Sequence, residues 1–109
     1  MAEILEQVVE DYLDEQVRGL GGFTRKCKWI GRRSAPDRVV FYRGVYFVEL
    51  KRPKKRAEPA QHREHRRMAG QGALVCTLST KEQVDEFILA IQGDYKKWLE
   101  ISLQNHIKT

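Results

Sequence analysis

Three residues near the middle of the chain have side chains suited to chemistry: Asp37, Glu49 and Lys51. They occur in the stretch APDRVVFYRGVYFVELKRP, residues 35–53, which otherwise indicates two short apolar strands around a tight turn. Glu49 and Lys51 are two positions apart, so in a strand their side chains point to the same face. A surface salt bridge of little energetic value would explain that pair. It would not explain Asp37 at the start of the partner strand.

The length of the turn decides whether the two acids meet. A two-residue loop would place Asp37 and Glu49 on opposite faces of the sheet. A three-residue loop, 42–44, pairs Phe41 with Val45 and places the two acids directly opposite each other. Such loops favour a type I turn closed by a left-handed residue, and the last residue of this loop is a glycine. The sequence therefore predicts the three-residue loop and a carboxylate pair on one face.

Two facing carboxylates repel each other unless a cation neutralises them. Hard oxygen ligands suit Mg²⁺ or Mn²⁺, and Mg²⁺ needs few protein ligands when substrate phosphate and water complete its coordination. The carbonyl of Leu50 is available as a further ligand beside Asp37 and Glu49. Such a metal polarises a phosphodiester and lowers the pKa of water, while Lys51 would position that water or offset charge on phosphorus. The pattern therefore predicts phosphodiester hydrolysis.

The charge of the chain is strongly segregated. Residues 1–24 contain one Arg and six acids, residues 25–67 contain 15 Lys or Arg and four acids, and residues 68–109 contain four Lys and five acids. A basic stretch of this density favours a polyanionic partner, and nucleic acid fits it better than a membrane surface. No stretch is apolar enough to span a bilayer. Cys27 and Cys76 are far apart in the sequence, so they form neither a metal knuckle nor a disulfide framework.

Periodicity and turn residues predict one α/β domain over residues 1–109, with a mixed four-stranded sheet, helices on both faces and an extra C-terminal helix. Ser79 or Thr80 is expected to cap the third helix. The predicted elements are a helix at 3–19, strands at 23–30, 38–42 and 45–50, a helix at 59–69, a strand at 73–78, and helices at 81–92 and 94–107.

Several motifs, in order and at compatible spacing, resemble one nuclease family. PD at 36–37 and ELK at 49–51 match the PD-(D/E)xK superfamily. EDYL in the first helix, together with GRRSAPDR, FVELKRP and PAQHREHRR, is similar to the VRR-Nuc domain in its small stand-alone phage and bacterial form. The resemblance covers roughly residues 5–90.

The resemblance implies a restriction-endonuclease-like αβββαβ core and metal-dependent DNA cleavage. Under it, Asp37 and Glu49 are metal ligands and Lys51 is the catalytic lysine. Glu10 matches the acid of the family's first helix, and Gln61 matches the glutamine of the helix after the ExK strand.

The positions of the first-helix acids on the helical wheel give a separate indication of which one can reach the site. Glu10 borders the apolar stripe of this helix, from where a carboxylate can reach a site at the edge of the sheet. Glu6 borders the same stripe and is the main alternative, whereas Glu3 and Asp14 look solvated.

Basic side chains are expected to contact phosphates without reading base sequence. Lys26 is the cation of the first strand that the family pattern supports, and it shares a face with Lys28. The others are expected on loops flanking the site: Arg32, Arg33, Arg38, Arg52, Lys54, Lys55 and Arg56.

These observations predict a Mg²⁺- or Mn²⁺-dependent endonuclease for branched DNA such as four-way junctions, in the cytoplasm of a bacterium or a phage-infected host. Domains resembling this one look like junction-resolving nucleases, which are homodimers, and YKKWLEISL at 95–103 offers an aromatic stripe for such an interface. Packing of that stripe on its own core is the alternative. A non-catalytic nucleic-acid-binding module is the alternative function, and the sequence leaves RNA open as a substrate.

Overall fold

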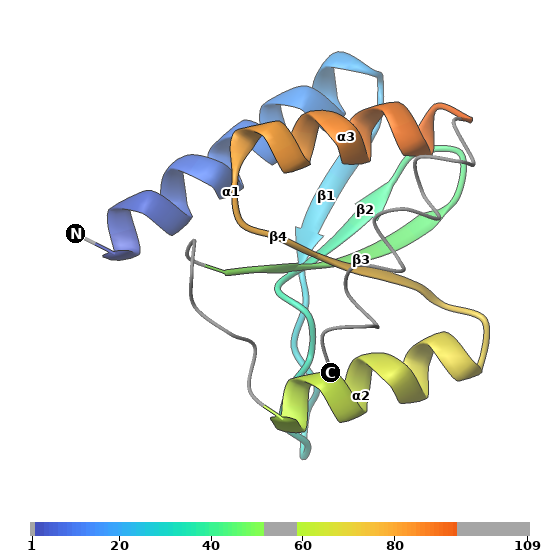
Figure 1. The fold of residues 1–109 in the computed structure, drawn as a ribbon. Coiled ribbons are helices and arrows are strands. Elements are labelled where there is room, and N and C mark those ends of the chain that lie inside the picture. The colour runs from blue at the N-terminus through green and yellow to red at the C-terminus, as the bar shows by residue number, and fades with distance from the viewer. Residues whose placement is uncertain (1, 52–58, 94–109) are drawn as a thin grey trace.

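A computed structural model of the chain describes residues 2–51 and 59–93 (Figure 1). The predicted order of the elements within these residues is confirmed. The elements are α1 (Ala2–Gly19), β1 (Phe23–Lys26), β2 (Arg38–Phe41), β3 (Val45–Leu50), α2 (Pro59–Gly70), β4 (Leu74–Leu78) and α3 (Lys81–Ile91). The predicted C-terminal helix and the aromatic stripe at 95–103 lie outside the described residues.

The four strands form one mixed sheet in the order β1-β2-β3-β4. The β1–β2 and β2–β3 pairs are antiparallel, and β3 and β4 are parallel. Parallel neighbours need a crossover, and α2 provides it. Helices α1 and α3 cover one face of the sheet and α2 lies on the other face (Figure 1). This arrangement confirms the predicted mixed sheet with helices on both faces.

The core lies between the sheet and the α1/α3 layer. The apolar stripe of α1 contributes Leu13 and Val17, both fully buried, because its apolar positions recur at helical spacing. Strands β2 and β3 contribute Val40 and Val48 to the same cluster, and α3 contributes Phe87. Side chains alternate along a strand, so the residues next to these valines face α2 instead.

The predicted register of the hairpin is confirmed, because Phe41 pairs with Val45 across a three-residue loop. Extending the register beyond the Arg38–Val48 pair brings residues 37 and 49 opposite each other. The predicted position of the left-handed residue was wrong. Arg43 adopts φ 51°, in the left-handed helical region, whereas Gly44 has φ 159°, a positive value outside that region which residues with a side chain rarely adopt.

The structure also corrects the predicted end of β1 and decides between the two residues proposed to cap α3. Strand β1 ends at Lys26, so Lys28 lies beyond the strand in which the two lysines were expected to share a face. Thr80 rather than Ser79 caps α3, and its side chain accepts a hydrogen bond from the Gln83 amide at 3.1 Å. In the described part of the chain, no helix has the length and apolar character needed to cross a bilayer.

Candidate active site

Glu49 is the centre of a polar cluster between the sheet and α2. It occupies the penultimate position of β3 and is only 2% exposed. Its Oε2 atom accepts a hydrogen bond from Gln61 Nε2 of α2 at 2.8 Å and lies 3.3 Å from Lys51 Nζ. The Lys51 side chain is 14% exposed, so this ion pair is largely buried. The surface salt bridge considered from the sequence is therefore not what the structure contains.

Asp37 reaches the same end of the hairpin from the partner strand. Its Oδ2 atom accepts a hydrogen bond from the backbone N–H of Leu50 at 2.7 Å. The N–H and C=O of one strand residue point to the same side, so the Leu50 carbonyl also points away from β4 toward Asp37. Asp37 itself is exposed. A buried carboxylate, an exposed carboxylate and a backbone carbonyl thus meet at the end of β3.

The environment of Glu49 favours its protonated form. Burial, followed by the charge of Asp37, raises the pKa of the Glu49 carboxyl to about 7, against the opposing effects of Lys51 and the Gln61 hydrogen bond. A buried carboxyl pushed this far beside a second acid is typical of functional sites.

The donor set fits a hard divalent cation. Glu49 Oε1 is buried and has no hydrogen-bond partner among the residues that the structure describes. An unsatisfied buried oxygen is costly, and a cation beside it would satisfy it. Asp37 and the Leu50 carbonyl add hard oxygen ligands, which Mg²⁺ and Mn²⁺ prefer. No cluster of three or more His, Cys, Asp or Glu side chains placed to hold a metal exists within residues 2–51 and 59–93.

Comparison with known proteins shows which family the chain belongs to. No family model matches the chain, but a curated protein and a solved structure do. A curated protein named "Putative nuclease p44", from Acyrthosiphon pisum secondary endosymbiont phage 1, is 37% identical over 84 residues, covering 75% of this chain and 90% of that protein. A solved structure described as "VRR_NUC domain" superposes with a TM-score of 0.72 at 38% identity, covering 83% of this chain and 97% of the other. The chain belongs to the VRR-Nuc family. It is therefore a nuclease domain of the VRR-Nuc type.

In this VRR-Nuc domain the first-helix acid Glu10 lies on the α1/α3 side of the sheet. Its carboxylate is paired with Arg38, whose guanidinium also lies 3.1 Å from Asp14 of α1. Glu10 is not among the groups that shift the pKa of Glu49. The structure thus brings Asp37, Glu49 and the lysine together and places Glu10 with an arginine.

Two sequence-based placements on this side were wrong. Arg38 was expected on a loop, but it is the first residue of β2. It is buried because the alternation of side chains along the strand directs it toward α1. Asp14 is not simply solvated, since it also accepts a hydrogen bond from Thr24 Oγ1 at 2.7 Å.

Some of the other predicted DNA-contacting residues lie within the described part of the chain and some lie outside it. Lys26, Arg32 and Arg33 are exposed in the structure. Residues 52–56, which contain Arg52, Lys54, Lys55 and Arg56, lie outside the described residues.

Sequence reasoning overlooked a second polar group in the VRR-Nuc domain. Glu64 of α2 is buried, and it accepts a hydrogen bond from Trp29 Nε1 at 2.8 Å. The two residues are 35 positions apart, so no local pattern pairs them. The available signal was an acid among the arginines of HREHRR, the only acid of that helix.

Proposed function

We propose that this VRR-Nuc domain is a Mg²⁺- or Mn²⁺-dependent endonuclease that hydrolyses phosphodiester bonds in DNA. The observation that carries the proposal is the buried Glu49 carboxylate, one oxygen of which has no hydrogen-bond partner among the described residues, next to Asp37 and Lys51. Burial of a carboxylate in such a setting is costly unless a cation compensates it. Family membership supports the same reading.

In this proposal, Asp37, Glu49 and the Leu50 carbonyl hold the metal. When bound, the ion supplies Lewis-acid polarisation of the phosphodiester and lowers the pKa of water. Lys51 offsets negative charge that develops on the phosphate oxygens or orients the attacking water. Gln61 fixes the Glu49 carboxylate through its hydrogen bond, so it is a positioning residue.

The substrate we propose is branched DNA such as a four-way junction, cut by a homodimer. The stretch 25–67 is dense in Lys and Arg, which favours backbone contacts over base readout. A chain of 109 residues covers little duplex alone, and a two-fold pair would present two sites to two strands.

The test compares wild type with Glu49→Gln and a matched control, Glu15→Gln, which makes the same chemical change at an exposed position of α1. Labelled flaps, forks, four-way junctions and an RNA duplex are incubated with Mn²⁺. We expect cleavage of branched DNA by wild type and by the control, with a loss on the order of 100-fold or more in Glu49→Gln.

Two outcomes would count against the proposal. Nicking that survives in Glu49→Gln would place the chemistry elsewhere. Tight binding of junctions by wild type without any nicking would favour the alternative, a non-catalytic nucleic-acid-binding module. Preferential cleavage of RNA would keep the site and change the substrate.

A further inference from the structure

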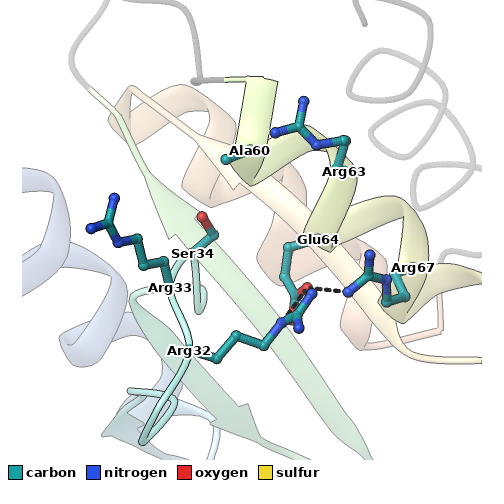
Figure 2. A pocket seen from close by; sticks show the side chains of 7 residues that line it. All are labelled: Arg32, Arg33, Ser34, Ala60, Arg63, Glu64 and Arg67. Carbon is teal, nitrogen blue, oxygen red and sulfur yellow. Dashed lines mark hydrogen bonds and ion pairs between the residues drawn. The ribbon is translucent and has the colours of Figure 1, made fainter.

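A second basic feature lies on the α2 side of the sheet, in a cavity of about 200 Å³ between the loop after β1 and α2 (Figure 2). Four arginines line it, two from the loop and two from the helix, and one arginine of each pair reaches the single acid of the cavity (Figure 2). The lining residues are Arg32, Arg33, Ser34, Ala60, Arg63, Glu64 and Arg67.

Glu64 organises this cavity from its buried side. Its side chain is 10% exposed; one oxygen accepts the Trp29 hydrogen bond, and the other lies 3.4 Å from Arg32 Nε and 3.7 Å from an Arg67 nitrogen. These contacts tie the loop to the helix and fix two guanidinium groups. A guanidinium has five N–H donors, so most donors of Arg32 and Arg67 remain available after pairing with Glu64.

The charges around the cavity do not balance. Arg33 and Arg63 form no ion pair within the described residues, so the lining of the cavity holds four guanidinium groups and only one carboxylate. Like charges gathered around a cavity repel unless an anion enters. Guanidinium groups bind phosphate in a bidentate manner, and the cavity is smaller than those that hold drug-sized ligands, about 300–1,000 Å³. A phosphate group therefore matches both its charge and its size.

The two walls of the cavity also supply the active site. The loop that carries Ser34 continues into Asp37 three residues later, and α2 provides both Gln61, which contacts Glu49, and Arg63. A phosphate held here would lie on the same side of the sheet as the carboxylate pair.

We propose that this arginine-lined cavity holds a backbone phosphate of the DNA substrate, distinct from the phosphate that is hydrolysed, and thereby sets the position of the strand in the active site. The inference rests on the proposed nuclease function. It adds Arg63 and Arg67 to the DNA-contacting residues and gives Glu64 a positioning role.

The first experiment measures DNA binding in EDTA, so that its outcome does not depend on cleavage. It compares wild type, the double variant Arg63→Gln/Arg67→Gln and the control Arg25→Gln/Arg43→Gln, which removes two exposed arginines outside the cavity. Loss of one phosphate contact lowers the slope of log affinity against log salt by about 0.9. We expect that reduction in the cavity variant beyond any change in the control. Arg63→Gln alone, with thermal unfolding of each variant, checks that folding is intact.

The second experiment replaces individual phosphates near the cut with neutral methylphosphonates. Wild type should lose affinity at one particular position where the cavity variant loses none, while both lose equally elsewhere. Additive losses at every position would overturn the proposal. The proposal would also be overturned if the cavity variant lost binding of inorganic phosphate but kept its affinity for DNA. That result would identify the cavity as a site for a free anion. If wild type binds but does not cleave, the nuclease proposal fails while the phosphate site is still decided.

Discussion

At the scale of residues, Glu49 links the proposed chemistry to a measurable property of folding. The pKa of its carboxyl is about 7 in the folded chain, against an ordinary value of 4.5. The folded state therefore binds a proton more tightly than the unfolded state. The resulting stabilisation is complete below about pH 4.5 and is lost as the pH rises through 7.

Glu49→Gln should remove this pH dependence. The amide stays neutral, so in EDTA the variant should be more stable than wild type at pH 8, by up to about 3 kcal/mol for a shift of this size. Thermal unfolding from pH 5 to pH 8 measures the effect, with Glu15→Gln as the control. Parallel curves for wild type and Glu49→Gln would show that the Glu49 carboxyl is not perturbed.

Metal binding should restore the folding stability that wild type loses at high pH. A cation binds the ionised carboxylate and the folded state only, so it competes with the proton and stabilises the fold. Saturating Mn²⁺ should raise the melting temperature of wild type more at pH 8 than at pH 6, and by much less in Glu49→Gln. An equal shift in the two proteins would place the ion elsewhere.

Lys51 allows metal binding and catalysis to be separated. Removing its ammonium takes away a cation that lies 3.3 Å from Glu49 Oε2 but no oxygen ligand. Lys51→Ala should therefore bind Mn²⁺ at least as well as wild type by calorimetry, while cleavage falls on the order of 100-fold. Lys81→Ala, at an exposed position of α3 outside the predicted DNA-contacting set, serves as the comparison. Loss of metal binding in Lys51→Ala would assign the lysine a structural role.

At the scale of elements, the connection between α1 and β1 depends on a close approach of two backbones. A Cβ atom at Gly22 would lie 2.5 Å from the Phe41 carbonyl oxygen and 3.1 Å from Val17 Cγ1. Gly22→Ala should cost about 1–3 kcal/mol, because backbone must move to admit the methyl group. Its melting temperature should fall on the order of 10 °C. Gly19→Ala, with open space around its Cβ position, should be neutral or slightly stabilising.

The sequence predicted the hairpin because local rules specify it. Two short apolar runs and the length of the loop between them predicted the Phe41–Val45 pairing. The same rules did not identify which loop residue is left-handed, since Arg43 rather than the glycine adopts that conformation. Strand β1 was overextended because the apolar and basic alternation continues past Lys26 while the pairing with β2 does not.

Contacts between distant elements were beyond such rules. The pairing of Glu10 with Arg38 depends on which face of β2 meets α1, and a one-residue shift of the pairing register reverses that face. The hydrogen bond from Trp29 to Glu64 likewise exists only because α2 packs against the loop after β1. Sequence spacing predicted which residues could lie in one site. Which site each helix residue joins depends on how the helices pack on the sheet, and spacing does not give that.

At the scale of the whole molecule, the proposed dimer makes a prediction that a monomeric nuclease does not. A heterodimer of one wild-type and one Glu49→Gln subunit would have one competent site. Two-fold cutting by a homodimer resolves a four-way junction, whereas the heterodimer should nick one strand and leave the junction unresolved. Co-expression with two different affinity tags isolates the heterodimer, and a supercoiled cruciform plasmid distinguishes nicked from linear product. Linear product at the wild-type rate would show that one subunit makes both cuts, and a monomeric mass in light scattering would exclude the dimer itself.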